Sequence, residues 1–80
     1  MTQGPHFSGP FEKMKHGQYT ALRLLAQGHT RSAAARKLNI SEGGLRHRMH
    51  ALRKLTGTRS TLQLVALAVV HGVITLEDIQ

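Results

Sequence analysis

The chain has 80 residues, of which 40% are hydrophobic but only 4% are aromatic, so we expect one small domain whose core is built from Leu, Val, Ile and Ala. Cys is absent, which excludes disulfides and thiolate metal sites, and no apolar stretch has the form of a secretory signal or the length of a membrane-spanning helix. The formal net charge is +7, and we expect a cytoplasmic, nucleoid-associated protein without membrane contact.

The basic residues are concentrated in the middle of the chain. Eight of the eleven Lys and Arg residues lie between positions 31 and 59, where Glu42 is the only acidic residue. No Lys or Arg follows Arg59, whereas Glu77 and Asp78 lie near the end. Such segregation is typical of a surface that binds a polyanion, because phosphate contacts supply most of the non-specific affinity for nucleic acid. The alternative is a solvated basic face on an ordinary helical domain.

Residues 1–13 contain both prolines, Pro5 and Pro10, and show no apolar periodicity. They are predicted to form a flexible N-terminal arm that ends in a short turn after Pro10. Lys13 is the only basic residue with which this arm could contact a DNA groove. Residues 14–80 are predicted to form the folded domain.

A first helix is predicted over residues 15–27. Its apolar stripe consists of Tyr19, Leu22, Leu25 and Ala26. Gly28 follows at the position where a left-handed residue ends a helix. Gly17 lies in the first turn and weakens that end of the helix.

A second helix is predicted over residues 31–38, with Thr30 as its N-cap. The small side chains of Ala33–Ala35 would let another helix approach closely. Asn39 tolerates the left-handed conformation, so a tight turn is predicted to follow, with Ile40 buried beneath it. With the next helix, these elements are predicted to form a helix-turn-helix.

A third helix is predicted to run from its N-cap, Ser41, to Leu55, with Glu42 at the positive end of the helix dipole. Its apolar positions, at three-and-four spacing, are Leu45, Met49, Leu52 and Leu55. Its opposite face carries Arg46, His47, His50, Arg53 and Lys54. An apolar back with a cationic, hydrogen-bonding front is typical of a helix that reads DNA. The glycines at positions 43 and 44 either let the backbone come close to DNA or let this end order on binding.

A fourth helix is predicted over residues 61–71, with Thr61 as its cap. It contains seven consecutive apolar residues, Leu64–Val70, so it nearly lacks the polar side of a surface helix. One face must cover the domain's own core, and the other is exposed unless a second molecule covers it. We therefore expect a homodimer formed through Leu62, Val65, Ala66 and Val69. The alternative is that the N-terminal arm or the tail, residues 73–79, folds over this face.

Several short motifs in this order resemble the LuxR-type (GerE-like) helix-turn-helix DNA-binding domain. The motifs are Leu22–Gly28, Ala34–Glu42, Arg59-Ser60, Val65–Ala68 and Gly72–Ile74. The resemblance covers about residues 14–74 without a gap and implies an all-α fold, a four-helix bundle with a helix-turn-helix. In that family the third helix enters the major groove of DNA and the fourth mediates dimerisation. The resemblance implies a sequence-specific transcriptional regulator, with a recognition helix at about residues 41–56 and double-stranded DNA as partner.

Carried over by position, the resemblance assigns base reading to Arg46, His47 and His50. It assigns phosphate contacts to Thr30, Arg31, Arg48, Arg53, Lys54 and Arg59. The chain departs from the family at three places: it has Gly17-Gln18 where Arg-Glu is usual, Ala33 in place of a frequent Glu, and Thr56 in place of a frequent apolar residue. These changes remove charged positions that in the family brace the fold or touch phosphates.

Other function classes find less support in the sequence. An enzyme is not expected, because no phosphate-binding glycine loop and no nucleophile–base arrangement can be identified. His47 and His50 have a helical spacing that could hold a metal, but no third ligand is evident, so no metal or cofactor is expected. The alternative function is a protein-interaction module that binds or sequesters another transcription regulator or RNA polymerase. No sensory domain fits in 80 residues.

Overall fold

The computed structural model describes residues 9–79, which form five α-helices after a short 3₁₀ turn and contain no strand. The elements are the 3₁₀ turn η1 (Gly9–Phe11), α1 (His16–Ala26), α2 (Arg31–Lys37), α3 (Glu42–Thr56), α4 (Thr61–Val70) and α5 (Leu76–Ile79). The radius of gyration is 11.7 Å, close to the roughly 12 Å of a folded chain of this length. The predicted all-α class is confirmed, but α5 was not predicted.

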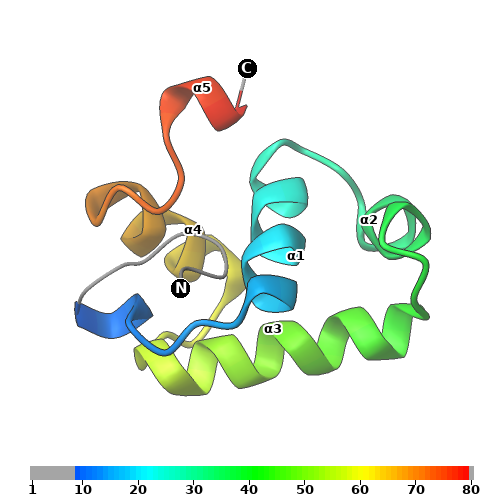
Figure 1. The fold of residues 1–80 in the computed structure, drawn as a ribbon, viewed down its shortest axis with the longest axis horizontal. Helices are drawn as coiled ribbons and strands as arrows, with labels where there is room; N and C mark the ends of the chain where they lie inside the picture. The colour runs from blue at the N-terminus through cyan, green and yellow to red at the C-terminus, as the bar shows by residue number, and fades with distance from the viewer. Residues whose placement is uncertain (1–8, 80) are drawn as a thin grey trace, which may run out of the picture.

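The longest helix, α3, lies along one side of the molecule and contacts η1, α1, α2 and α4 (Figure 1). Helix α1 stands against its middle, α2 lies at its N-terminal end, and η1 and α4 lie near its C-terminal end. Helix α5 lies on the opposite side of the molecule, against α1. The arrangement leaves α3 with one long side facing out.

The core lies between α3 and the helices above it. Its buried hydrophobic residues are Phe11, Ala21, Leu22, Ala34, Ala35, Leu45, Met49, Leu52, Leu64, Ala68, Val73 and Ile74. On α3 the predicted stripe is confirmed for three of its four members, but Leu55 is 43% exposed. At about 100° per residue, position 55 lies about 80° around the helix from position 45, which turns Leu55 away from the core. Helix α1 buries Ala21 beside Leu22, whereas Tyr19 and Leu25 are only half-buried.

The predicted turns follow the local rules that suggested them. Gly28 has φ +97° after α1, and Asn39 has φ +57° between α2 and α3. Thr30 caps α2, since its Oγ1 accepts a hydrogen bond from the Ala33 N–H at 3.1 Å. Ile40 lies half-buried against the core, less buried than predicted.

Helix α4 begins one residue earlier than its predicted cap implies. Ser60, not Thr61, is the N-cap, and its Oγ accepts a hydrogen bond from the Gln63 N–H at 3.0 Å. Ser60 has the extended backbone of a cap, whereas Thr61 is already helical. Both residues can cap a helix, so the sequence alone did not distinguish them.

The N-terminal segment contributes to the core. Residues 1–8 of the predicted arm lie outside the described residues, but Phe11 is only 1% exposed and its ring centroid is 6.0 Å from that of His71. The folded unit therefore includes Gly9–Phe11, which the sequence analysis assigned to the arm.

The outer face of α4 stays exposed although neighbouring segments fold onto the core. Val73 and Ile74 are buried, but Leu62 is 80% exposed and Val70 is 79% exposed. Of the other residues predicted at a dimer contact, Ala66 and Val69 are exposed and Val65 is half-buried. The described parts of the arm and tail thus do not cover this face.

Helix α5 is held to α1 by one ion pair. Arg23 Nε lies 3.1 Å from Asp78 Oδ1, and the other carboxylate oxygen accepts hydrogen bonds from the backbone N–H of Thr75 at 2.9 Å and from its hydroxyl at 3.0 Å. The Thr75 N–H and hydroxyl, and then the Arg23 charge, lower the pKa of Asp78 below its ordinary value of 3.8. A depressed carboxyl pKa stabilises the folded state at neutral pH.

We predict that Phe11→Ala lowers the free energy of unfolding by about 3 kcal/mol, because it removes a large side chain from the core. Urea denaturation followed by circular dichroism measures the change. Leu76→Ala is the control and should stay within about 0.5 kcal/mol of the wild type, because Leu76 is exposed and lies outside the proposed dimer contact. Equal stability of the two variants would contradict the packing of Phe11.

We predict that Asp78→Asn lowers the melting temperature at pH 7. The extra stability of the wild type over Asp78→Asn is fully present above the pKa that Asp78 has in the unfolded chain. It is lost as the pH falls through the lower pKa that Asp78 has in the folded chain. Melting curves between pH 7 and pH 2.5 should therefore converge at the acid end. Glu77→Gln, at an exposed neighbour without an ion pair in residues 9–79, should show no such gap. A gap that persists unchanged at the lowest pH would show that the carboxylate charge is not responsible.

Candidate nucleic-acid interface

Both ends of α3 are fixed by local hydrogen bonds. Ser41 Oγ accepts a hydrogen bond from the Gly44 N–H at 2.9 Å, as predicted for the N-cap, and Glu42 lies in the first turn. At the other end, Gly57 has φ +73° and donates its N–H to the Arg53 carbonyl. The Thr56 hydroxyl donates to the Leu52 carbonyl at 2.9 Å. The helix is therefore defined over its full length of 15 residues, or about 22 Å.

The side of α3 opposite its buried stripe carries the predicted reading residues. Arg46, His47 and His50 are all exposed on this side, together with Lys54, while Arg53 is half-buried. None of these five side chains makes a hydrogen bond or ion pair within residues 9–79. The structure thus brings the three residues into one row whose donors are free to contact another molecule.

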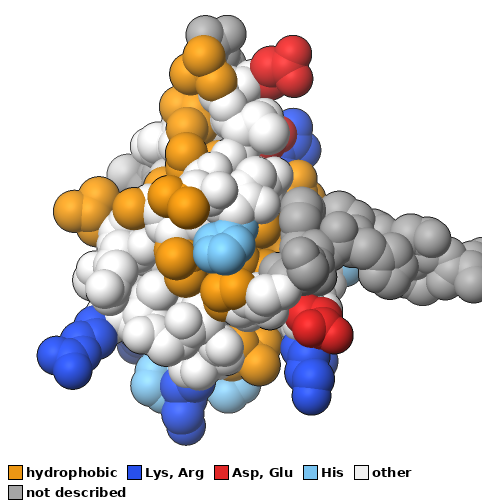
Figure 2. Space-filling model, turned by 90° about the vertical axis from the view of Figure 1, so that its left-hand side faces the viewer, with side chains coloured by type: hydrophobic (Ala, Val, Ile, Leu, Met, Phe, Trp, Pro, Cys, Tyr) orange, Lys and Arg blue, Asp and Glu red, His pale blue; other side chains and the backbone are white. Residues whose placement is uncertain are grey.

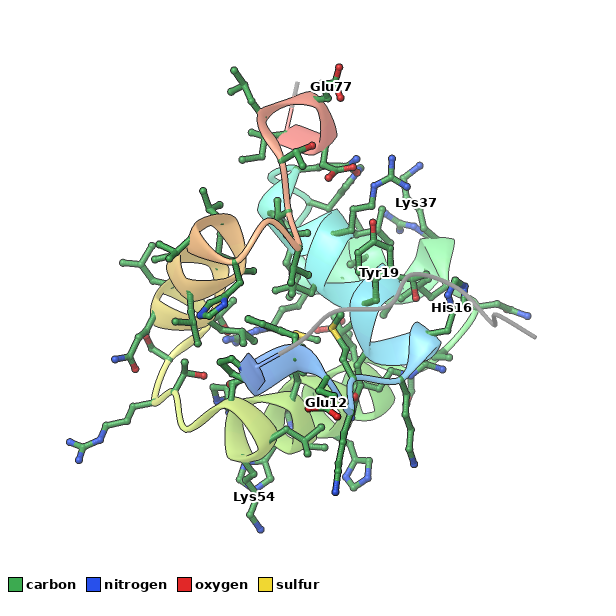
Figure 3. All side chains as sticks on the ribbon, turned by 60° about the vertical axis from the view of Figure 1, so that its left-hand side comes forward. Glu12, His16, Tyr19, Lys37, Lys54 and Glu77 are labelled. Atoms are coloured by element: carbon green, nitrogen blue, oxygen red, sulfur yellow. The ribbon has the colours of Figure 1, made fainter. Side chains whose placement is uncertain are left out.

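The four acidic residues are divided between the two ends of the molecule: Glu77 and Asp78 belong to α5, whereas Glu42 begins α3 and Glu12 follows η1, which contacts α3. Lys54 on α3 projects from one end and Glu77 on α5 from the other (Figure 3). A space-filling view shows Lys, Arg and His side chains along the α3 edge, with apolar side chains over α4 and α5 (Figure 2). The one ion pair of the described chain, Arg23–Asp78, joins α1 to α5 and leaves the cations of α3 unneutralised. Such a concentration of one sign of charge attracts polyanions.

The predicted phosphate-binding residues outside α3 do not form one cluster with it. Thr30 and Arg31 lie at the start of α2, and Arg59 lies in the loop beyond the C-terminal end of α3. The Thr30 oxygen caps α2, which leaves the hydroxyl proton free to donate. The Arg59 side chain is exposed, and its backbone N–H is anchored by the Gln63 side-chain oxygen at 2.7 Å. Arg59 thus follows the C-terminal end of α3, whereas Thr30 and Arg31 lie at the end of α2 that is farther along the chain from α3.

Arg48 differs from the other predicted phosphate contacts because it braces the fold. Its side chain is half-buried and crosses to α1, where Nη1 donates to the Gly17 carbonyl at 3.2 Å. A Cβ at position 17 would lie 3.1 Å from that nitrogen, so a glycine leaves space for the guanidinium. The sequence analysis took Gly17 only as a weak start of the helix. The contact spans 31 residues, and no local pattern indicates it.

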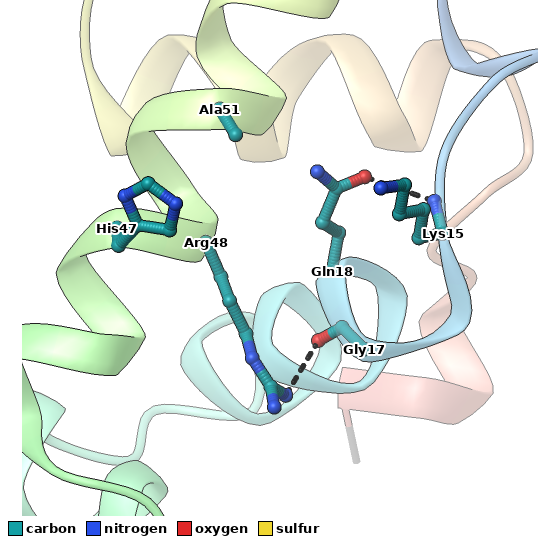
Figure 4. Close-up of a pocket in the computed structure, with 6 residues that line it drawn as sticks. All are labelled: Lys15, Gly17, Gln18, His47, Arg48 and Ala51. Atoms are coloured by element: carbon teal, nitrogen blue, oxygen red, sulfur yellow. Dashed lines mark hydrogen bonds between the residues drawn. The ribbon is translucent and has the colours of Figure 1, made fainter.

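Gln18 is a buried polar residue that sequence reasoning missed. It is 8% exposed, and its Oε1 accepts a hydrogen bond from the Lys15 N–H at 2.9 Å. Position 18 is the third residue of α1, where Glu or Gln often reaches back to the residue before the helix, so this signal was available in the sequence. Together with its neighbours it lines a pocket between α1 and α3 (Figure 4). The lining residues are Lys15, Gly17, Gln18, His47, Arg48 and Ala51.

Comparison of the chain with protein-family models, with curated proteins and with solved structures found no match. The resemblance to the LuxR-type domain therefore rests on the sequence motifs alone. Within residues 9–79, no helix is both long and apolar enough to cross a membrane, and no three His, Cys, Asp or Glu side chains gather as metal ligands would.

Proposed function

We propose that this chain is a sequence-specific, double-stranded-DNA-binding transcriptional regulator in which α2, the following turn and α3 form a helix-turn-helix of LuxR type. One observation carries the proposal. Helix α3 buries an apolar back and presents Arg46, His47 and His50 in an exposed row with no partner in the described chain. Such a row has no use in holding the fold together, but it matches the acceptors and donors on base edges in the major groove.

The dimensions of α3 suit the groove. An α-helix is about 10–12 Å in diameter, and the major groove of B-DNA is about 12 Å wide. In the proposed complex Arg46 donates two hydrogen bonds to O6 and N7 of a guanine, and His47 and His50 contact neighbouring bases or phosphates. The remaining cations, Arg53 and Lys54, contact the backbone, which fixes the position of the helix without carrying sequence information.

Helix α2 would hold the recognition helix at a constant angle. Its buried residues, Ala34 and Ala35, have side chains of one carbon and allow close approach to α3. The turn through Asn39 comprises the four residues 38–41, a length that fits a helix-turn-helix. Thr30 and Arg31 at the start of α2, and Arg59 beyond α3, would contact phosphates on either side of the groove.

The exposed face of α4 supports a homodimer as the binding form. Leu62, Val69 and Val70 are large apolar side chains that contact water in the single chain, and association with a second copy would bury them. Two copies related by a two-fold axis would place their α3 helices about one turn of DNA apart, which implies a roughly palindromic site. We propose a cytoplasmic, nucleoid-associated location on the same grounds.

Two arginine substitutions should separate base reading from phosphate contact. Arg46→Ala is expected to cost about 1–3 kcal/mol on the specific site and to relax sequence preference there. Arg59→Ala is expected to weaken all DNA sequences similarly and to reduce the dependence of affinity on salt. Fluorescence anisotropy titrations at two salt concentrations measure both effects. If Arg46→Ala leaves binding unchanged, α3 is not the recognition helix.

A charge on α4 should disrupt the dimer. Val69→Glu is expected to release monomer in sedimentation equilibrium, because the carboxylate would have to be desolvated in an apolar contact. Ser32→Glu adds the same charge on the exposed side of α2 and should leave the association unchanged. A wild-type chain that stays monomeric both free and on DNA would refute this part of the proposal.

The exposed α4 face also favours the second candidate function, a module that docks on another transcription regulator or on RNA polymerase. This function needs the apolar face but not the row on α3. If Val69→Glu abolishes binding of such a partner protein and Arg46→Ala leaves that binding unchanged, the docking function would be favoured over DNA reading.

A further inference from the structure

A groove lies between the outer face of α4 and the loop that joins α3 to α4. Its volume is about 380 Å³, and its walls are formed by residues 56–58 of the loop and by Gln63, Ala66, Leu67 and Val70 of α4. These four positions of α4 have the i, i+3, i+4, i+7 spacing of one helix face. The groove therefore runs along α4 for two turns and belongs to the apolar surface over this helix (Figure 2).

The polar side chains of the groove already make hydrogen bonds within the chain. The hydroxyl oxygens of Thr56 and Thr58 lie 3.0 Å apart, and the Thr56 hydroxyl also donates to the Leu52 carbonyl. Gln63 Oε1 accepts a hydrogen bond from the Arg59 N–H at 2.7 Å. No Lys, Arg, Asp or Glu lines the groove. The groove thus suits an apolar side chain, whose burial there would be favourable.

Ala66 marks the centre of the outer face of α4. At about 100° per residue, it lies about 160° around the helix from each of the two buried residues, Leu64 and Ala68. It therefore points directly away from the core. Its side chain of one carbon allows a neighbouring helix to approach closely, since the distance between packed helices depends on the side chains at the contact. A second helix would cross α4 most closely at this position.

The two flanks of this face carry different side chains. Leu62 and Val69 lie about 40° and 60° from Ala66 on one flank, and Val70 and Gln63 lie at the same angles on the other. In an antiparallel pair of α4 helices with a two-fold axis at Ala66, each residue faces the partner's residue on the same flank and at the opposite end. Leu62 then faces the partner's Val69, and Val70 enters the groove beside the partner's Gln63.

The distribution of charge favours a second copy in this antiparallel direction. Helix α4 carries no charged residue, so two chains of net charge +7 repel least through this face. Arg59 lies directly before the N-cap of α4. Parallel α4 helices would bring the two Arg59 side chains together at one end, whereas antiparallel helices place them at opposite ends. Antiparallel packing also opposes the two helix dipoles.

We infer that two copies associate through antiparallel α4 helices that cross at Ala66, with Val70 of each copy seated in the partner's groove. This geometry rests on the homodimer of the proposed function and specifies the direction of the helices, their register and the occupant of the groove. Gly57, the C-cap of α3, lies in the wall of the groove. The partner therefore contacts the segment that ends the proposed recognition helix (Figure 1).

Cross-linking tests the register directly, because the chain has no Cys of its own. Ala66→Cys should give a disulfide-linked dimer on oxidation, since helices that cross at this position bring the two Cα atoms within the range of about 4.4–6.8 Å that a disulfide spans. Leu62→Cys alone should not, because its two copies would lie about 12 Å apart along the helices. An equal mixture of Leu62→Cys and Val69→Cys should give the mixed dimer, identified by mass. Ser32→Cys, exposed on α2, is the control and should not cross-link.

Sedimentation equilibrium of Val70→Ala tests the groove. This variant should raise the Kd of the dimer at least about tenfold, because each copy withdraws two methyl groups from its partner's groove. Leu76→Ala truncates a comparably exposed apolar side chain on α5 and is the matched control, with an unchanged Kd expected. An unchanged Kd of Val70→Ala would overturn the assignment of the groove and leave it to a segment of the same chain or to another protein.

The remaining outcomes separate this geometry from the proposed function. A wild type that sediments as a dimer while Ala66→Cys forms no disulfide-linked dimer would overturn the geometry, and the homodimer would stand through another contact. Efficient linking of Leu62→Cys to itself would indicate parallel helices and would also overturn it. A monomeric wild type, free and on DNA, would remove both the homodimer and this geometry, whereas Arg46→Ala would still decide DNA reading. If Ala66→Cys links as expected in a chain that binds no DNA, the geometry stands and the DNA-reading function fails.

Discussion

The burial of Leu45, Met49 and Leu52 is the interaction on which the rest of the structure depends. These three side chains fix α3 against α1, α2 and α4, and truncating a buried side chain of this size typically costs about 2–5 kcal/mol. Because an α-helix has only one face to bury, fixing this stripe also determines which residues of α3 face the solvent. The exposed row that carries the proposed DNA contacts is thus a direct consequence of core packing.

Features governed by local rules could be predicted from the sequence. Thr30 and Ser41 were identified as N-caps because a hydroxyl before an apolar repeat can accept a bond from the first turn. Asn39 was identified as the left-handed residue of the turn, and its φ of +57° confirms this. The shared face of Arg46 and His50 followed from the helical period alone, although their function remains a proposal.

Contacts between distant parts of the chain could not be predicted in this way. Arg48 reaches Gly17 across 31 residues and Arg23 reaches Asp78 across 55, and neither pair forms a pattern within one element. Phe11 follows a proline in a segment without periodicity, so only the three-dimensional packing shows that it belongs to the core. The pocket at the start of α1 depends on the first of these contacts. The fold class was therefore easier to predict than the residues that complete the site.

The central claim is that the exposed row of α3 reads a DNA sequence. It is tested most directly by selecting bound duplexes from a random pool with the wild-type chain and with Arg46→Ala. The account predicts that the wild type recovers a motif with two related half-sites about one helical turn apart, each containing a guanine whose enrichment is lost with Arg46→Ala. Recovery of no motif by the wild type, or of the same motif by both proteins, would contradict it.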